Sequence, residues 1–121
     1  MRRFGQRLAC AFKGIFLTFK SERNFRIQCV ALCLTVAMGV YLGLSKLEWG
    51  LIIFSIGLVL TAEVLNTAVE RLGDVVAGGK YNNLVRDIKD ISAGAVMVSA
   101  LTALTIGVLI LFVPFVQRVL G

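Results

Sequence analysis

The sequence contains no histidine and only one proline among its 121 residues. The lack of histidine excludes imidazole triads, histidine zinc sites and imidazole general bases, so carboxylates must do any acid–base work. The three cysteines form no C-x-x-C pair, and Cys29 and Cys33 lie in an apolar run, where a thiol behaves as a small hydrophobic group. We therefore expect neither a disulfide nor a metal site at the cysteines.

Charged residues are also few: they make up 17% of the chain, whereas 58% of the residues are hydrophobic. A water-soluble domain needs a largely polar surface, so this composition argues against a soluble enzyme. The 13 Lys and Arg against 7 Asp and Glu give a net charge of +6. Such an excess suits anionic lipid headgroups or phosphorylated ligands, and the long apolar runs make nucleic acid an unexpected partner.

Three apolar runs predict three transmembrane helices in an all-α membrane protein of one domain, residues 1–121. The first uncharged run has 19 residues, which is about 28 Å of helix and so roughly one hydrocarbon thickness. Pro114 falls near the far end of the third run, where a break in the helix costs little. We place the spans at about 26–45, 48–70 and 91–114, with a loop at about 71–90.

The residues before the first span, about 3–20, predict an amphipathic helix on the membrane surface. Their apolar side chains fall within about 120° of a helical wheel, and basic and polar side chains occupy the rest. A helix packed on a soluble partner would have the same pattern. The apolar side chains are Phe4, Leu8, Phe12, Ile15, Phe16 and Phe19.

The basic residues outside the spans are divided unevenly between the two sides of the membrane. Of the 13, 11 lie on the side shared by the N-terminus and the 71–90 loop. The positive-inside rule then predicts a cytoplasmic N-terminus and a cytoplasmic loop.

Four polar residues of the second span, Glu63, Asn66, Glu70 and Asp74, share one helix face because their spacings are 3, 4 and 4. A charge at the centre of a span costs on the order of 2.5–3.5 kcal/mol, so this face must meet protein, a wet cleft or a partner chain. An acidic stripe at a basic membrane edge suits a divalent cation. Glu63 lies deepest and is our candidate general base. Glu70 and Asp74 could instead be the solvated end of the helix, paired with Arg71 or Arg86, and for Asp74 this alternative has at least equal weight.

Two further polar groups reach the same membrane edge. Lys89 and Asp90 directly precede the third span, and Glu22 lies between the surface helix and the first span. Glu22 and Arg26 are also spaced for an i,i+4 pair within one helix, which is the alternative to a functional role. Lys80 does not belong to a Walker A loop, because Asp74 stands where that motif needs glycine.

Small residues at every fourth position of the third span permit close helix approach. Three thin spans and one surface helix can hardly enclose a site alone, so we expect a homo-oligomer. The small residues are Ala95, Ser99, Ala103 and Gly107.

The string from Glu63 to Glu70, E-V-L-N-T-A-V-E, resembles the signature of the prokaryotic diacylglycerol kinase and undecaprenol kinase family. The strings K-D-I-S-A-G-A-V from Lys89 and E-R-N-F-R from Glu22 resemble it too, and the second is closer to members that act on undecaprenol. The resemblance covers essentially the whole chain. It implies a trimeric lipid kinase of the bacterial cytoplasmic membrane that transfers the γ-phosphate of MgATP to the hydroxyl of undecaprenol or diacylglycerol, with sites shared between protomers on the cytoplasmic side.

The same resemblance implies a role for each matching residue. Glu63 would be the general base on the lipid hydroxyl, and Glu22 and Glu70 would hold Mg²⁺. The nucleotide would contact Asn66, Lys89 and Asp90, with Arg3, Lys80 and Tyr81 as further contributors.

A different class of function would use the same carboxylate. A small oligomeric membrane protein without enzymatic activity, or a proton-coupled transporter, could use Glu63 as its proton site. Such a transporter would move substrate along a proton gradient without consuming ATP.

Overall fold

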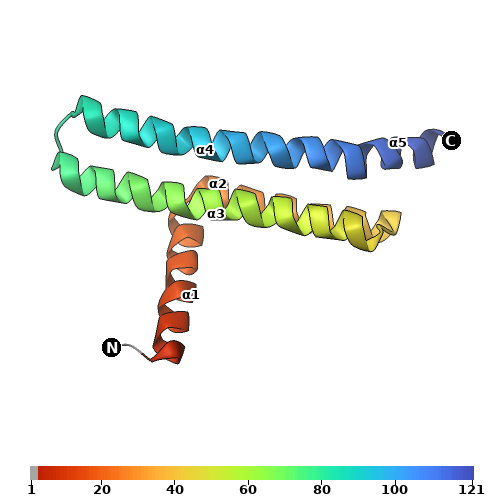
Figure 1. Cartoon of the computed structure of the whole chain (residues 1–121), viewed down its shortest axis with the longest axis horizontal. Coiled ribbons are helices and arrows are strands. Elements are labelled where there is room, and N and C mark those ends of the chain that lie inside the picture. Colours follow the sequence, from red (N-terminus) through yellow and green to blue (C-terminus); the bar gives the residue numbers. More distant parts are fainter. Residues whose placement is uncertain (1–2) are drawn as a thin grey trace.

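A computed structural model describes residues 3–121 of the chain, and every regular element in that range is helical. The elements are α1 (Phe4–Ser21), α2 (Arg23–Leu42), α3 (Lys46–Ala77), α4 (Asn83–Gly107), a short π-helical stretch (Val108–Phe112) and α5 (Val113–Leu120) (Figure 1).

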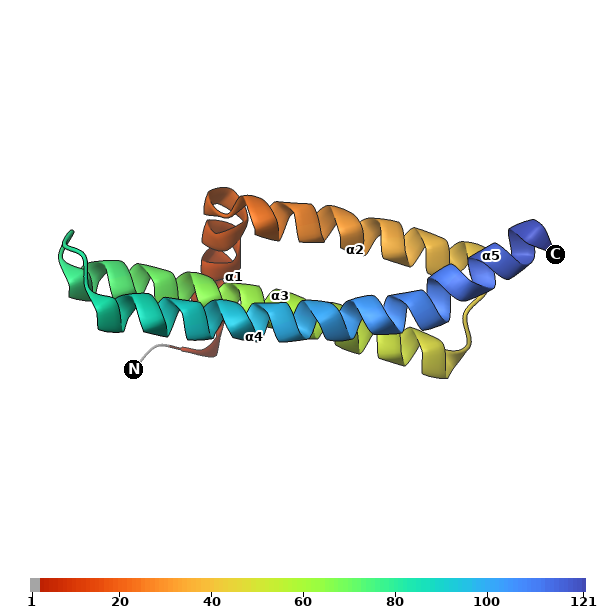
Figure 2. The same ribbon diagram turned by 90° about the horizontal axis from the view of Figure 1, so that it is seen from above.

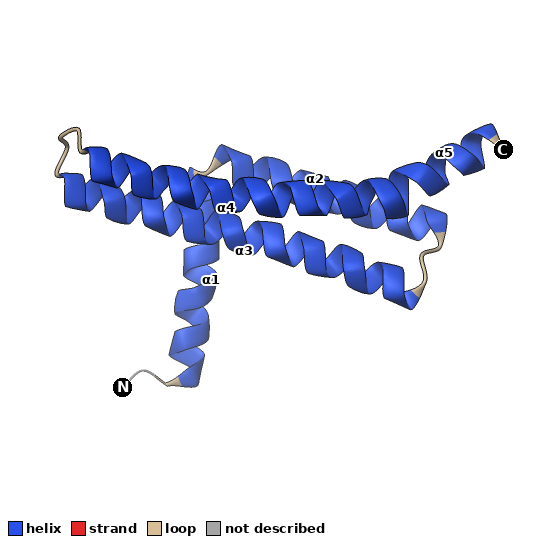
Figure 3. Cartoon of the chain, turned by 45° about the horizontal axis from the view of Figure 1, so that its top comes forward, coloured by secondary structure: helices blue, strands red, loops and turns tan. Residues whose placement is uncertain are grey.

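Three of the helical rods are long and apolar enough to cross a membrane: α2, α3 and the continuous rod from Asn83 to Leu120. They lie alongside one another, whereas α1 leaves the bundle at a steep angle (Figures 1 and 3). The predicted all-α fold, with an N-terminal helix and three spans, is confirmed.

The apolar face of α1 has no cover within the chain. Phe4 and Phe12 are 76% and 68% exposed, and only Thr18 of this helix is buried. A helix of this kind, projecting from the spans near the membrane edge, fits the interfacial role that the sequence predicts.

The helices begin and end at residues that are typical of helix caps. Ser45 and Glu48 form a capping box at the start of α3, and Asn82 accepts a hydrogen bond from the Val85 N–H at the start of α4. Gly43 and Gly78 take the left-handed conformation directly after α2 and α3, where glycine carries no steric penalty.

The segment expected as a loop, about 71–90, is helical at both ends. Helix α3 continues to Ala77 and α4 begins at Asn83, so only 78–82 form the turn. Gly73 makes this possible: a Cβ atom there would lie 3.0 Å from Val85 Cγ1, so glycine lets the ends of α3 and α4 pack closely.

The last span bends before Pro114. Proline has no N–H, and its ring clashes with the carbonyl four residues earlier, so the helix widens into the π-helical stretch. Beyond the bend, α5 leans over the end of α2 (Figure 2). There Arg118 Nη1 donates to the Tyr41 carbonyl at 2.7 Å, and the Tyr41 and Phe115 rings lie 6.5 Å apart.

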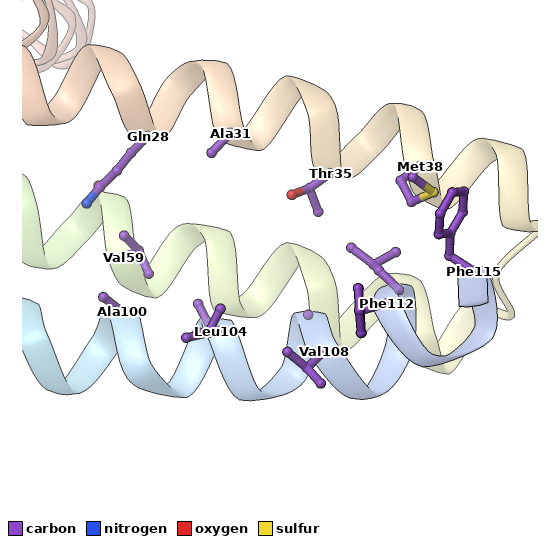
Figure 4. A pocket seen from close by; sticks show the side chains of 13 residues that line it. Gln28, Ala31, Thr35, Met38, Val59, Ala100, Leu104, Val108, Phe112 and Phe115 are labelled. Carbon is purple, nitrogen blue, oxygen red and sulfur yellow. The ribbon is translucent and has the colours of Figure 1, made fainter. Parts of the chain in front are cut away.

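Helix α3 packs along α4, while α2 stands apart from α4. The space between α2 and α4 is an apolar cavity of about 660 Å³, which runs from Gln28 to Phe115 (Figure 4). We call it the α2–α4 groove.

Candidate functional site

Glu63 is the most deeply placed carboxylate of the membrane spans. It lies on α3, is 6% exposed, and its Oε1 accepts a hydrogen bond of 2.7 Å from Gln28 Nε2 on α2. Gln28 is six residues beyond Glu22, which is about 9 Å along the helix. Glu63 is therefore buried between α2 and α3, about 9 Å along α2 from the corner, and is held by a neutral donor.

Asn66 and Glu70 occupy the next two turns of the same face. Asn66 Nδ2 donates to Glu70 Oε1 at 3.4 Å, and both side chains are half-buried. The carbonyl oxygen of Asn66 is buried and has no hydrogen-bond partner. The pair thus offers a carboxylate beside an unused amide oxygen, and both are hard ligands of the kind that Mg²⁺ prefers.

Glu22 lies at the corner between α1 and α2, where it caps both helices and is half-buried. The neighbouring Ser21 Oγ accepts a hydrogen bond of 2.7 Å from Arg71 Nη2, and Arg71 follows Glu70 on α3. This contact ties the corner to the stretch of α3 that carries Glu70. The alternative pairing of Glu22 with Arg26 within one helix is not formed: the Arg26 guanidinium donates to the carbonyls of Phe19 and Lys20 instead.

We call Gln28, Glu63, Asn66 and Glu70 the embedded cluster. Over residues 3–121, three or more acidic, histidine or cysteine side chains nowhere gather closely enough to hold a metal ion. A cation bound here would therefore need ligands from its substrate as well, as Mg²⁺ commonly has with nucleotide phosphates.

A second group of polar residues surrounds the turn between α3 and α4. They line a cavity of about 530 Å³, and Arg86 Nη1 donates to the Tyr81 hydroxyl at 2.6 Å. Asp74 forms an ion pair with Lys89, rather than with Arg71 or Arg86 as the sequence suggested. We call these residues the turn cluster: Asp74, Lys80, Tyr81, Arg86 and Lys89.

The two remaining candidates lie apart from these clusters. Asp90 is exposed on α4. Arg3 precedes α1, at the end opposite Ser21, so the 18-residue helix separates it by about 27 Å from the corner. One chain alone does not bring Arg3 to the other candidates.

Gln28 is the residue that sequence reasoning missed. A signal was present, because it is the only amide or charged side chain in the run 27–45. An amide at that depth needs a partner, since an unsatisfied polar group in hydrocarbon is costly.

Comparisons with known proteins give this site a context. The family model for prokaryotic diacylglycerol kinase matches residues 9–111. An undecaprenol kinase of Bacillus subtilis is 38% identical over 94% of this chain and 91% of its own length. A diacylglycerol kinase of Escherichia coli is 30% identical over 87% of this chain and 85% of its own. For a diacylglycerol kinase of Synechocystis the identity is 31%, over 88% of this chain and 61% of that protein.

The relatives include kinases only, so they do not favour a transporter or a protein without enzymatic activity. Together with the three candidate spans, these matches establish that the chain belongs to the prokaryotic diacylglycerol kinase family and is an ATP-using lipid kinase of the bacterial inner membrane.

Proposed function

We propose that the protein phosphorylates undecaprenol, with Glu63 as the general base. The choice of lipid is supported by the relative named undecaprenol kinase, which matches at 38% identity over 94% of the chain, against 30% and 31% for the two diacylglycerol kinases. The E-R-N-F-R string from Glu22 supports the same choice.

The carboxylate of Glu63 takes the proton of the lipid hydroxyl as the oxygen attacks the γ-phosphorus of ATP. A new O–P bond forms, the bond between the γ-phosphorus and the β–γ bridging oxygen breaks, and ADP leaves. The burial of Glu63 supports this role, because the lipid hydroxyl cannot leave the membrane and the base must lie within its reach. This buried carboxylate is the observation that carries the proposal.

Mg²⁺ would be held by Glu22 and Glu70. The donor set fits it: two half-buried carboxylates near the tied corner, with the unpaired amide oxygen of Asn66 beside one of them. When bound, Mg²⁺ neutralises the phosphate charge that otherwise repels the attacking oxygen.

The nucleotide would contact Asn66, Lys89 and Asp90, with Arg3, Lys80 and Tyr81 as further contributors. The turn cluster supports this placement, because it sets two lysines around a cavity at the end of α3 and α4. Cations near the phosphates stabilise the charge of the transition state.

The active enzyme would be a homotrimer of the single domain 1–121, with shared sites on the cytoplasmic side. Two features support this assembly. Arg3 is remote from the remaining candidates of its own chain, and the long apolar faces of α1 and of the spans have no cover. The excess of basic residues on the side of α1 and the α3–α4 turn supports the orientation.

Purified protein in detergent micelles tests the proposal. With radiolabelled MgATP and either undecaprenol or diacylglycerol, we expect labelled lipid product, formed faster from undecaprenol. A faster reaction with diacylglycerol would overturn the choice of lipid. The absence of phosphorylated product from both lipids would overturn the proposed lipid kinase activity.

A further inference from the structure

Gln28 joins the candidate base to the apolar interior of the bundle. It lies on α2, lines one end of the α2–α4 groove, and reaches across to α3 (Figure 4). The nearest polar side chain further along the groove wall is Thr35, two turns away on the same helix. Gln28 is therefore the polar group at one end of the groove, and among residues 3–121 Thr35 is the only other polar side chain that lines it.

Both ends of the Gln28 amide are informative. Its nitrogen donates to Glu63 Oε1 at 2.7 Å, a hydrogen bond between side chains of two different helices, α2 and α3. Its carbonyl oxygen is buried and has no partner. A buried oxygen without a hydrogen-bond partner is costly, so glutamine would be an unfavourable residue at this position if its only role were packing.

The hydrogen bond limits what Glu63 can do. A carboxylate on a flexible side chain rotates, and a bond to one oxygen fixes the plane of the group. Because the amide is neutral, it achieves this without placing a second charge in the membrane.

We propose that Gln28 is a positioning residue of the phosphoryl transfer: it holds Oε1 of Glu63 so that the other oxygen faces the hydroxyl of the acceptor lipid. The inference rests on the proposed role of Glu63 as the base. It assigns to α2 a part in the reaction that the family signature on α3 does not contain.

The test compares two replacements of Gln28 in the purified, assembled protein. Gln28→Met keeps the length and removes the donor, and Gln28→His keeps a neutral N–H donor. We expect Gln28→Met to lower kcat about tenfold or more, with KM for ATP changed less than about twofold, because a hydrogen bond to a charged group is lost and the nucleotide site is untouched. Gln28→His should retain activity within about threefold of the wild type.

Thr35→Val is the matched control. It removes a polar atom from the same helix and the same groove and leaves Glu63 alone, so kcat should stay within about twofold. Size-exclusion chromatography in micelles checks that each variant assembles like the wild type. If Gln28→Met does not assemble, Gln28→Leu takes its place.

Three results would overturn the inference while the kinase itself stands. They are full activity of Gln28→Met, equal loss in the Met and His variants with intact assembly, and a loss that lies in KM for ATP alone. Absence of lipid-dependent turnover in the wild type is a different failure, that of the proposed function.

Discussion

The embedded cluster and the turn cluster share helix α3, yet their carboxylates are satisfied in different ways. In the embedded cluster, Glu63 and Glu70 each accept a hydrogen bond from a neutral amide. In the turn cluster, Asp74 pairs with the ammonium group of Lys89. An amide satisfies a carboxylate without bringing a second charge into hydrocarbon, whereas an exposed ion pair is cheap in water and contributes little. The same face of α3 thus carries a carboxylate suited to hydrocarbon at Glu63 and a carboxylate suited to water at Asp74.

Loss of the deepest carboxylate should have the largest effect. We expect Glu63→Gln to lower kcat by about 10²- to 10⁴-fold, the usual contribution of a general base, with assembly unchanged. Lipid phosphorylation in micelles measures it. Glu48→Gln is the control, because it changes a carboxylate of the same helix that lies in the first turn, at the end opposite the embedded cluster. Comparable activity of Glu63→Gln and the wild type would remove the base from the mechanism.

Glu70 is the member of the embedded cluster that lies nearest to Asp74 along α3, and its loss should affect the binding of the metal. Loss of an outer partner of a metal site costs about 10- to 100-fold in affinity or activity, and loss of a ligand should cost at least as much. We expect Glu70→Gln to require a higher Mg²⁺ concentration for half-maximal rate, as a titration with MgCl₂ would measure. An unchanged Mg²⁺ requirement would contradict the assignment.

Lys89 should affect the nucleotide rather than the lipid. Lys89→Gln removes a cation from the turn cluster, and we expect KM for ATP to rise about tenfold, as for one lost charge-assisted contact. KM for the lipid, determined in the same assay, should stay unchanged. If only KM for the lipid changed, the assignment of the turn cluster to nucleotide binding would be contradicted.

Asp74 should show the smallest effect, although it shares its face with Glu63. Its side chain is 70% exposed, and an exposed ion pair is worth about 0–1 kcal/mol. We expect Asp74→Asn to leave both kcat and KM for ATP within about twofold of the wild type. A large loss of kcat would instead show that Asp74 takes part in the reaction and is not only a solvated end of the helix.

Much of this arrangement could be predicted from the sequence. Uninterrupted apolar runs gave the number of spans, and the 3–4–4 spacing indicated that α3 carries a polar face that lipid cannot cover. The depth of Glu63 follows from its position seven residues before Glu70. Periodicity is a property of one helix, so it can be read from one sequence.

Contacts between helices could not be predicted in the same way. The partner of Glu63 depends on how far α2 is rotated toward α3, and several rotations bury an equally apolar surface. The close approach of α3 and α4 could not be predicted either, because the contact surface that Gly73 offers to Val85 involves two helices. The pairing of Asp74 with Lys89 depends on that same close approach.

The angle between α1 and the spans has a consequence for how the enzyme is seated in a bilayer. A helix in the headgroup layer would hold the protein at a fixed level, because α1 is joined to the spans at the corner at Glu22 (Figure 3). Gln28, which donates to Glu63, then lies about 9 Å from that corner, as measured along α2. With α1 in the headgroup layer, as the sequence predicts, the depth of Glu63 would be set from the near surface of the membrane, so a thicker or thinner bilayer would shift the far ends of the spans and leave the proposed base at the same level.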